Sequence, residues 1–141
     1  MYGDATVVRA QARLMRERAG EIRAEADELA GRAAAVPWTG LAAHAMRRTA
    51  DDHASRLRAS ATAHETAADA LDRHAREVDH RKEMIAAIEH RALHLLDSVT
   101  GGFAGLVGHV LPDGLAHWAH HFEPPLHGSM AWLDVHLPRP A

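Results

Sequence analysis

The sequence predicts an all-α protein: an antiparallel hairpin of two long helices, an overlong second helix, and a C-terminal tail that contains a short helix. Two apolar heptad patterns, separated by a single break at Val36–Gly40, predict the hairpin. Gly101-Gly102 then ends the second pattern. We therefore expect a hairpin domain over residues 1–100 and an apolar, histidine-rich extension over residues 101–141.

The first helix is expected at about residues 4–35, because one apolar column recurs every seven residues. That column contains Val8, Met15, Ile22, Leu29 and Val36. A second column of alanines follows four residues later, at Ala12, Ala19, Ala26 and Ala33. Large residues in one column and alanine in the other predict a helix-pairing seam in which two backbones approach closely.

The break contains the residues that stop one helix and redirect the chain. Pro37 has no backbone N–H and biases Val36 out of the helical conformation. Gly40 permits a change of direction that other residues resist. Trp38 lies at the bend, where we expect its ring to close the end of the two-helix core.

The second helix is expected at about residues 41–97 and repeats the pattern of the first. One column contains Ala50, Leu57, His64, Leu71, Val78, Ile85, Ala92 and Val99, and alanines follow at positions 54, 61, 68 and 75. The alanine column then stops, because Lys82 and Glu89 occupy its next two positions. A fold about Trp38 would place residues whose numbers sum to about 77 opposite each other. The alanine column would then stop opposite the N-terminal end of the first helix, where the partner helix runs out.

Residues 76–99 continue the apolar pattern beyond the first helix and need a cover. The C-terminal tail, a second copy of the chain or a different protein could supply it. In the tail, Leu115, Trp118, Ala119 and Phe122 have the spacing of a short amphipathic helix. The segment from Met130 to Leu137 fits either a helical turn or an alternating strand.

Composition excludes several classes of function. The formal net charge of −3 argues against a nucleic-acid-binding protein, and the absence of cysteine excludes thiolate chemistry. The apolar run near 103–111 is too short to span a bilayer, so membrane contact is not expected. No signal-peptide pattern opens the chain, which we expect to be made in the cytoplasm. No phosphate-binding loop or nucleophile motif is present, so we expect neither an enzyme nor a cofactor.

Thirteen histidines dominate any hypothesis about a metal site. His90 and His94 have i, i+4 spacing, and His117 and His121 repeat it. Together the two pairs could supply four ligands to zinc or nickel. The glutamate of the H-E-x-x-H motif is missing, and we expect exposed histidines without metal. Full protonation would move residues 101–141 from −2 to +4, so a pH response of the tail stays an alternative.

Two alanine-rich helices joined at Trp38-Thr39-Gly40 resemble the WxG-motif (ESAT-like) helical hairpins of type VII secretion systems in actinobacteria and Firmicutes. The resemblance covers about residues 4–97 and implies that Trp38 and Gly40 form the inter-helix turn. It also implies a non-enzymatic protein that acts through helix–helix pairing. The expected partner in this homodimer or heterodimer, a four-helix bundle, is another hairpin protein or the N-terminus of a toxin. Export would then follow a route independent of a signal peptide.

Two departures from that family leave alternatives open. The chain is longer than the usual member, which has about 100 residues. The family's export signal, Tyr-x-x-x-Asp/Glu, is absent after the second helix: Leu93 precedes Asp97 by four positions, and the only tyrosine is Tyr2. One alternative is therefore a cytoplasmic adaptor that binds and targets a secreted toxin. A second alternative is a self-associating coiled-coil scaffold.

Overall fold

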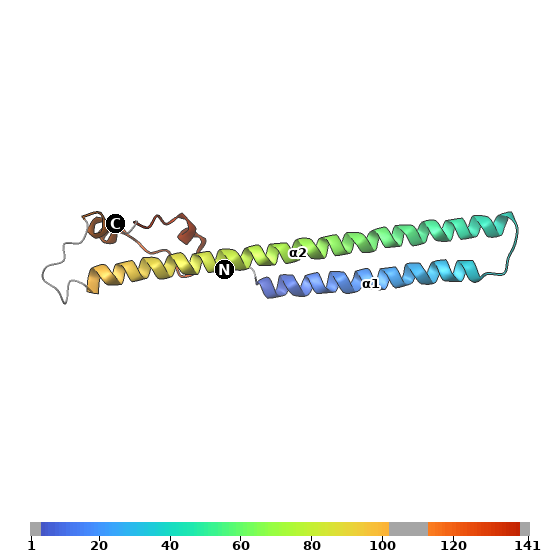
Figure 1. Cartoon of the computed structure of the whole chain (residues 1–141), viewed down its shortest axis with the longest axis horizontal. Coiled ribbons are helices and arrows are strands. Elements are labelled where there is room, and N and C mark those ends of the chain that lie inside the picture. Colours follow the sequence, from blue (N-terminus) through green and yellow to red (C-terminus); the bar gives the residue numbers. More distant parts are fainter. Residues whose placement is uncertain (1–3, 102–112, 139–141) are drawn as a thin grey trace. The chain divides into compact units, whose positions relative to one another are not determined.

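The computed structural model describes residues 4–101 and 113–138 and confirms the all-α class. Its elements are α1 (Ala5–Ala35), α2 (Leu41–Gly101), α3 (Asp113–His121) and the 3-10 helix η2 (Met130–Asp134). The described residues form two compact units, residues 4–77 and residues 78–138, and α2 contributes to both. In the first unit α1 lies against the early part of α2, and in the second the C-terminal segment lies against the later part (Figure 1).

Helix α1 begins and ends within one residue of the expected bounds. Asp4 is its N-cap, and the Asp4 carboxylate accepts a hydrogen bond from the Thr6 N–H at 2.8 Å. The helix ends at Ala35 because Val36 is extended, with φ −65° and ψ 122°, ahead of Pro37. Helix α2 begins at Leu41 as expected and continues to Gly101, four residues beyond the expected end.

The loop from Val36 to Gly40 does not close the core with Trp38, and this expectation was wrong. Trp38 is 64% exposed. Arg47 of α2 explains the loop's position, because its Nη2 donates to the carbonyl oxygens of Val36 (2.8 Å) and Trp38 (2.9 Å). Gly40 has φ +98°, a conformation that favours glycine, and its carbonyl accepts from the His44 N–H at 3.1 Å.

The pairing register of α1 and α2 also differs from the expected one. Arg16 contacts Asp69 and Asp72, Arg23 contacts Glu65, and Asp27 contacts Arg58. Facing residues therefore have numbers that sum to about 85–88 rather than about 77. The cause is the extended loop, since an extended residue rises about 3.3 Å and a helical residue about 1.5 Å. Five loop residues thus run past roughly ten residues of α2.

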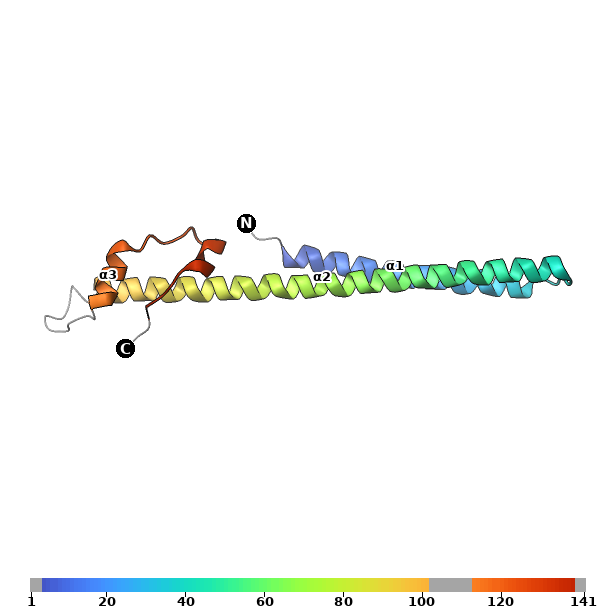
Figure 2. The same ribbon diagram turned by 90° about the horizontal axis from the view of Figure 1, so that it is seen from above.

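In the second unit, the C-terminal segment packs on α2. Trp132 is 1% exposed and forms a core with Ile85 and Ala92. Partly buried side chains surround that core: Ile88, Trp118, Phe122, Leu133, Val135 and Leu137. The two views agree that this segment runs alongside α2 (Figure 2). Of the three covers considered for this part of α2, the tail is thus the one present in the structure.

The tail contains the expected short helix and resolves the ambiguity of its last part. Helix α3 (Asp113–His121) precedes Pro124-Pro125, and Trp118 and Phe122 stack with ring centroids 4.5 Å apart. The last part is a helical turn rather than a strand. Ser129 caps η2 by accepting a hydrogen bond from the Ala131 N–H at 3.2 Å.

Candidate helix-pairing surface

The interface between α1 and α2 is made of alanine. In α1 the buried residues are Ala5, Ala12, Ala19, Ala26 and Ala33, one every seven positions. Opposite them, Ala54, Ala61, Ala68 and Ala75 of α2 are fully buried. Small side chains on both helices allow the two backbones to approach closely, as the sequence predicts. The hairpin therefore holds together along a narrow alanine seam, and its larger side chains lie beside that seam.

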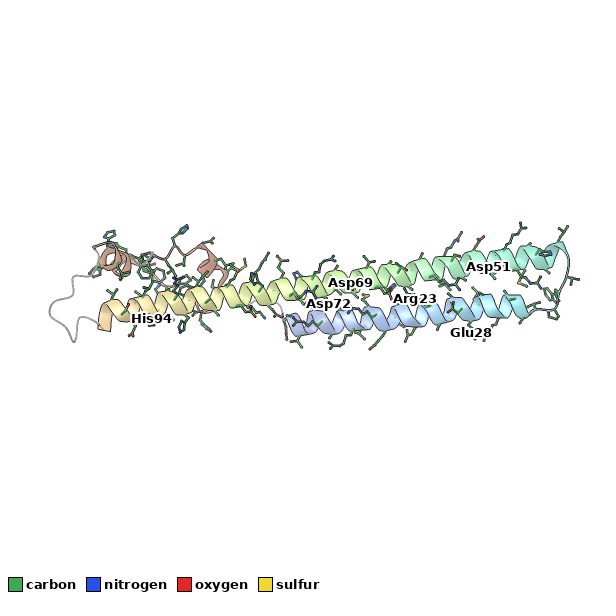
Figure 3. All side chains as sticks on the ribbon, viewed as in Figure 1. Arg23, Glu28, Asp51, Asp69, Asp72 and His94 are labelled. Carbon is green, nitrogen blue, oxygen red and sulfur yellow. The ribbon has the colours of Figure 1, made fainter. Side chains whose placement is uncertain are left out.

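Ion pairs line one side of the seam, which we call the charged flank. Arg16 Nη2 donates to Asp69 Oδ1 at 2.8 Å and to Asp72 Oδ2 at 2.7 Å. Arg23 donates two hydrogen bonds to the two carboxylate oxygens of Glu65. Arg58 Nη2 donates to Asp27 Oδ1 at 2.8 Å, and this third ion pair completes the flank. Figure 3 shows Arg23, Asp69 and Asp72 where α1 and α2 run side by side.

These ion pairs shift the protonation equilibria of their members. Hydrogen bonds from Arg23 hold the pKa of Glu65 below its ordinary value, against the opposing effect of partial burial. Hydrogen bonds to Asp72 and Asp69 raise the pKa of Arg16. Side chains this exposed add little to stability, because water and salt screen them. Their main effect is to fix the register, since each arginine meets its carboxylates at only one alignment of the helices.

Large side chains line the other side of the seam, which we call the apolar flank. It consists of Val8, Met15, Ile22 and Leu29 of α1 and Leu57, His64 and Leu71 of α2, all of them half-buried. Each of these residues lies three positions after a seam alanine, which places it about −60° around the helix axis from that alanine. Arg16 and Arg23 lie four positions after a seam alanine, at about +40° and thus on the other side. In an antiparallel pair, matching sides of the two helices share a face. The hairpin is therefore charged on one flank and apolar on the other.

Two hollows open on the hairpin around the residues of the apolar flank. One has a volume of about 640 Å³ and is lined mainly by apolar side chains, among them Leu29, Val36 and Met46. The other, of about 380 Å³, brings Met15 of α1 together with His64 of α2. The Nδ1–H of His64 donates to the Ser60 carbonyl of its own helix at 2.8 Å. Concave, partly apolar hollows of this kind can receive side chains from another protein.

Other apolar residues of the hairpin are exposed without belonging to either flank. Val7 and Leu14 of α1 are more than half exposed, and Leu41 beside the loop is 90% exposed. Trp38 and Gly40, the expected turn motif, both lie in the loop between α1 and α2. The loop end of the hairpin therefore carries two exposed apolar side chains, those of Trp38 and Leu41.

The residues expected in the seam divide between the two units. The first seven of them make up the apolar flank, whereas Val78 and Ile85 belong to the second unit and are buried there. Within the hairpin, alanine rather than these large residues makes the closest contacts. The role of these large residues as a helix-pairing seam stays a prediction.

The histidine pairs do not form a four-ligand site in the described residues. His90 and His94 have ring centroids 6.5 Å apart, and His117 and His121 have centroids 4.4 Å apart. The Nδ1–H of His121 donates to the His117 carbonyl at 2.9 Å. Across residues 4–101 and 113–138, no group of three or more histidine, cysteine, aspartate or glutamate side chains is placed to hold a metal ion.

Sequence reasoning missed a polar contact at Glu89. This residue is 9% exposed and is the one charged residue that is buried among those described. Its carboxylate accepts hydrogen bonds from His127 Nδ1 at 2.6 Å and from the Gly128 N–H at 3.4 Å. A glutamate among the apolar positions Ile85, Ile88 and Ala92 was the available signal, although nothing in the sequence points to His127 as its partner.

Comparisons with known proteins identify no relative. The chain matches no protein family, no curated protein and no solved structure. Within the described residues, none of the helices is both long enough and apolar enough to cross a lipid bilayer.

Proposed function

We propose that this protein is a non-enzymatic pairing subunit whose apolar flank binds a second helical hairpin to form a four-helix bundle. One observation carries the proposal. The alanine seam is fully buried, whereas the larger side chains beside it, such as Ile22 and Leu71, are only half-buried. A hairpin complete in itself would place its largest apolar side chains at the centre of its own interface.

The energetic gain from such pairing is large enough to matter. Full burial of a Val, Leu, Ile or Met side chain contributes about 1.5–3 kcal/mol, so completing a half-buried one adds about 1 kcal/mol. The apolar flank holds six such side chains in addition to His64. Their sum is comparable to the lower estimates of the entropy lost on association.

We further propose that this pairing serves type VII secretion, with the protein acting as an exported subunit of a WxG-like dimer. Two features support this role: the two-helix hairpin itself, and the position of Trp38-Thr39-Gly40 in the loop between α1 and α2. The exposed Trp38 ring is available to a partner rather than used within the hairpin. The proposed partner is a hairpin protein or the helical N-terminus of a toxin.

One observation favours the cytoplasmic adaptor as a second candidate. The position of the family's export tyrosine holds Leu93, which is exposed on α2. An adaptor needs the same apolar flank to hold a toxin but needs no export signal. The two candidates therefore share the pairing surface and differ only in where the protein ends up.

An export experiment separates the candidates. The chain and the product of its neighbouring gene would carry different epitope tags in a host with a working type VII system. The culture medium and cell lysate would then be probed for both tags. An exported subunit appears in the medium with its partner, whereas an adaptor stays in the lysate and co-purifies with that partner. Failure of the two proteins to co-purify would contradict both candidates.

A matched variant connects the result to the apolar flank. Ile22→Glu places a charge on that flank, whereas Glu21→Gln changes the neighbouring exposed position. We expect Ile22→Glu to abolish co-purification and Glu21→Gln to preserve it. Equal behaviour of the two variants would show that pairing uses another surface.

A further inference from the structure

Glu89 lies beneath the part of the tail formed by residues 126–137, which we call the C-terminal cover. Neighbouring positions on α2 are apolar: Ile85 is buried, Ile88 is partly buried and Ala92 is fully buried. The cover packs Trp132 into this group. A carboxylate in such a place is costly unless hydrogen bonds replace the water that it loses.

Both hydrogen bonds that the structure gives the Glu89 carboxylate come from the cover. His127 Nδ1 binds Oε1 at 2.6 Å, and the Gly128 N–H lies 3.4 Å from Oε2. Gly128 has φ +66°, a conformation that favours glycine and turns its N–H toward α2. These hydrogen bonds, led by the one from His127, hold the pKa of Glu89 below its ordinary value although burial opposes this.

The same short turn also seats the tryptophan. Trp132 Nε1 donates to the Leu126 carbonyl at 3.1 Å, and Ser129 caps the 3-10 helix that contains Trp132. His127 and Gly128 lie between these two anchor points. The donors to Glu89 and the anchor points of the buried indole therefore belong to one short segment.

We propose that the C-terminal cover is a reversible lid on α2 and that Glu89 makes its closure conditional on the contact with His127 and Gly128. When the cover is open, Glu89 loses both hydrogen bonds and water solvates its carboxylate instead. When it is closed, Glu89 needs both donors. An alanine, which continues the heptad column at Ala61, Ala68 and Ala75, would impose no such condition. Opening exposes the apolar stripe at Ile85, Ile88 and Ala92.

Water reaches the contact at Glu89, and one further charged side chain, that of Lys82, lies beside it. A hollow of about 270 Å³ beside the contact is lined by Lys82, Ala86 and His127 among others. The His127 side chain is 93% exposed, so water competes for its hydrogen bond. A contact that water can reach is suited to reversible closure, because water can take over the hydrogen bond when the contact breaks.

Hydrogen exchange measured by mass spectrometry on the intact chain tests the lid. The readout is the exchange rate of peptides covering residues 130–137, at pH values where the hairpin stays folded. His127→Ala should raise this rate about three- to tenfold, which is below the range expected for hydrogen bonds to a charged group because the donor is exposed. His127→Gln, which keeps a side-chain donor, should restore part of the protection.

A matched histidine and a second background make the test specific. His136 is also exposed on the cover, but its Nδ1 contacts the Asp134 carbonyl of the cover itself. His136→Ala should therefore leave the exchange rate unchanged. Glu89→Met, which replaces the buried charge by an apolar side chain of similar size, should slow exchange below that of the natural chain. In that background His127→Ala should have no effect.

Either of two results would overturn the proposal. One is an equal response to His127→Ala and His136→Ala. The other is an unchanged effect of His127→Ala in the Glu89→Met background, because the histidine would then act independently of the carboxylate. Both results leave the pairing of the hairpin untouched, so the lid and the proposed function fail separately.

Discussion

Arg23 of α1 and Glu65 of α2 meet across the hairpin with two hydrogen bonds between guanidinium and carboxylate. The residue before Arg23, Ile22, lies on the opposite side of the seam and is half-buried. A rotation of about 100° per residue thus places a register-fixing ion pair and an apolar pairing residue at consecutive positions. The sequence Ile22-Arg23 thus contributes one residue to the apolar flank and the next to the charged flank of the hairpin.

Acid should weaken this ion pair. The pKa of Glu65 is lowered in the folded state, so its contribution is complete above the ordinary value of 4.5 and is lost as the pH falls through the folded pKa. Urea unfolding at about pH 7, 5 and 3.5 in low salt should show a smaller acid-induced loss for Glu65→Gln than for the natural chain. The control is Glu25→Gln, which makes the same change at an exposed position of α1. Equal pH profiles for Glu65→Gln and the natural chain would contradict this role.

The alanine seam should resist enlargement. Ala19→Leu and Ala68→Leu each add three carbons at positions with no exposed surface, and each should lower the free energy of unfolding by about 1–3 kcal/mol. Ala24→Leu on the exposed side of α1 should change it by less than about 0.5 kcal/mol. Urea unfolding followed by circular dichroism measures all three variants. Similar midpoints for Ala19→Leu and Ala24→Leu would show that the helices are not closely packed.

Replacing either of two glycines by alanine should change the free energy of unfolding, but in opposite directions. Gly20 lies inside α1, and a Cβ added there would meet nothing within 4 Å, so Gly20→Ala should stabilise the helix by about 0.5–1 kcal/mol. Gly40 has φ +98°, so Gly40→Ala should destabilise by about 1 kcal/mol or more. Thermal unfolding of the two variants side by side provides the comparison. A stabilising Gly40→Ala would mean that the loop adopts another conformation.

Trp38 should matter little to the stability of the isolated hairpin. Because its ring is 64% exposed, Trp38→Ala should change the free energy of unfolding by less than about 0.5–1 kcal/mol. A tryptophan that closed the core would cost about 3–5 kcal/mol on the same change. Chemical unfolding at a protein concentration low enough to keep the chain monomeric distinguishes the two. A loss of about 3–5 kcal/mol would show that the Trp38 ring is buried in the core and would contradict this prediction.

Much of the fold follows from local sequence, and the differences have local causes. Heptad spacing, Pro37 and Gly40 were enough to place α1 and the start of α2, because helix periodicity and helix stops depend on neighbouring residues. The register was predicted wrongly because it depends on the extended conformation of Val36 and the hydrogen bonds from Arg47 to the loop carbonyls. Sequence spacing contains neither.

The contact at Glu89 illustrates the harder case. Glu89 and His127 are 38 positions apart, and no periodic pattern relates them. The sequence does show that Glu89 lies among the apolar positions Ile85, Ile88 and Ala92, which marks the position as unusual. The two residues meet because the tail packs on α2 around Trp132. The apolar flank was predictable as a set of residues, whereas its half-exposure was not.

The most direct test of the central claim is the mass of the protein in solution. Light scattering of the purified 15.3 kDa chain would be measured alone and after co-expression with its neighbouring gene product. We predict a dimer or a 1:1 complex that Ile22→Glu dissociates without loss of helical signal. A well-folded monomer under both conditions would contradict the pairing role, since the apolar flank would then remain half-exposed without a partner.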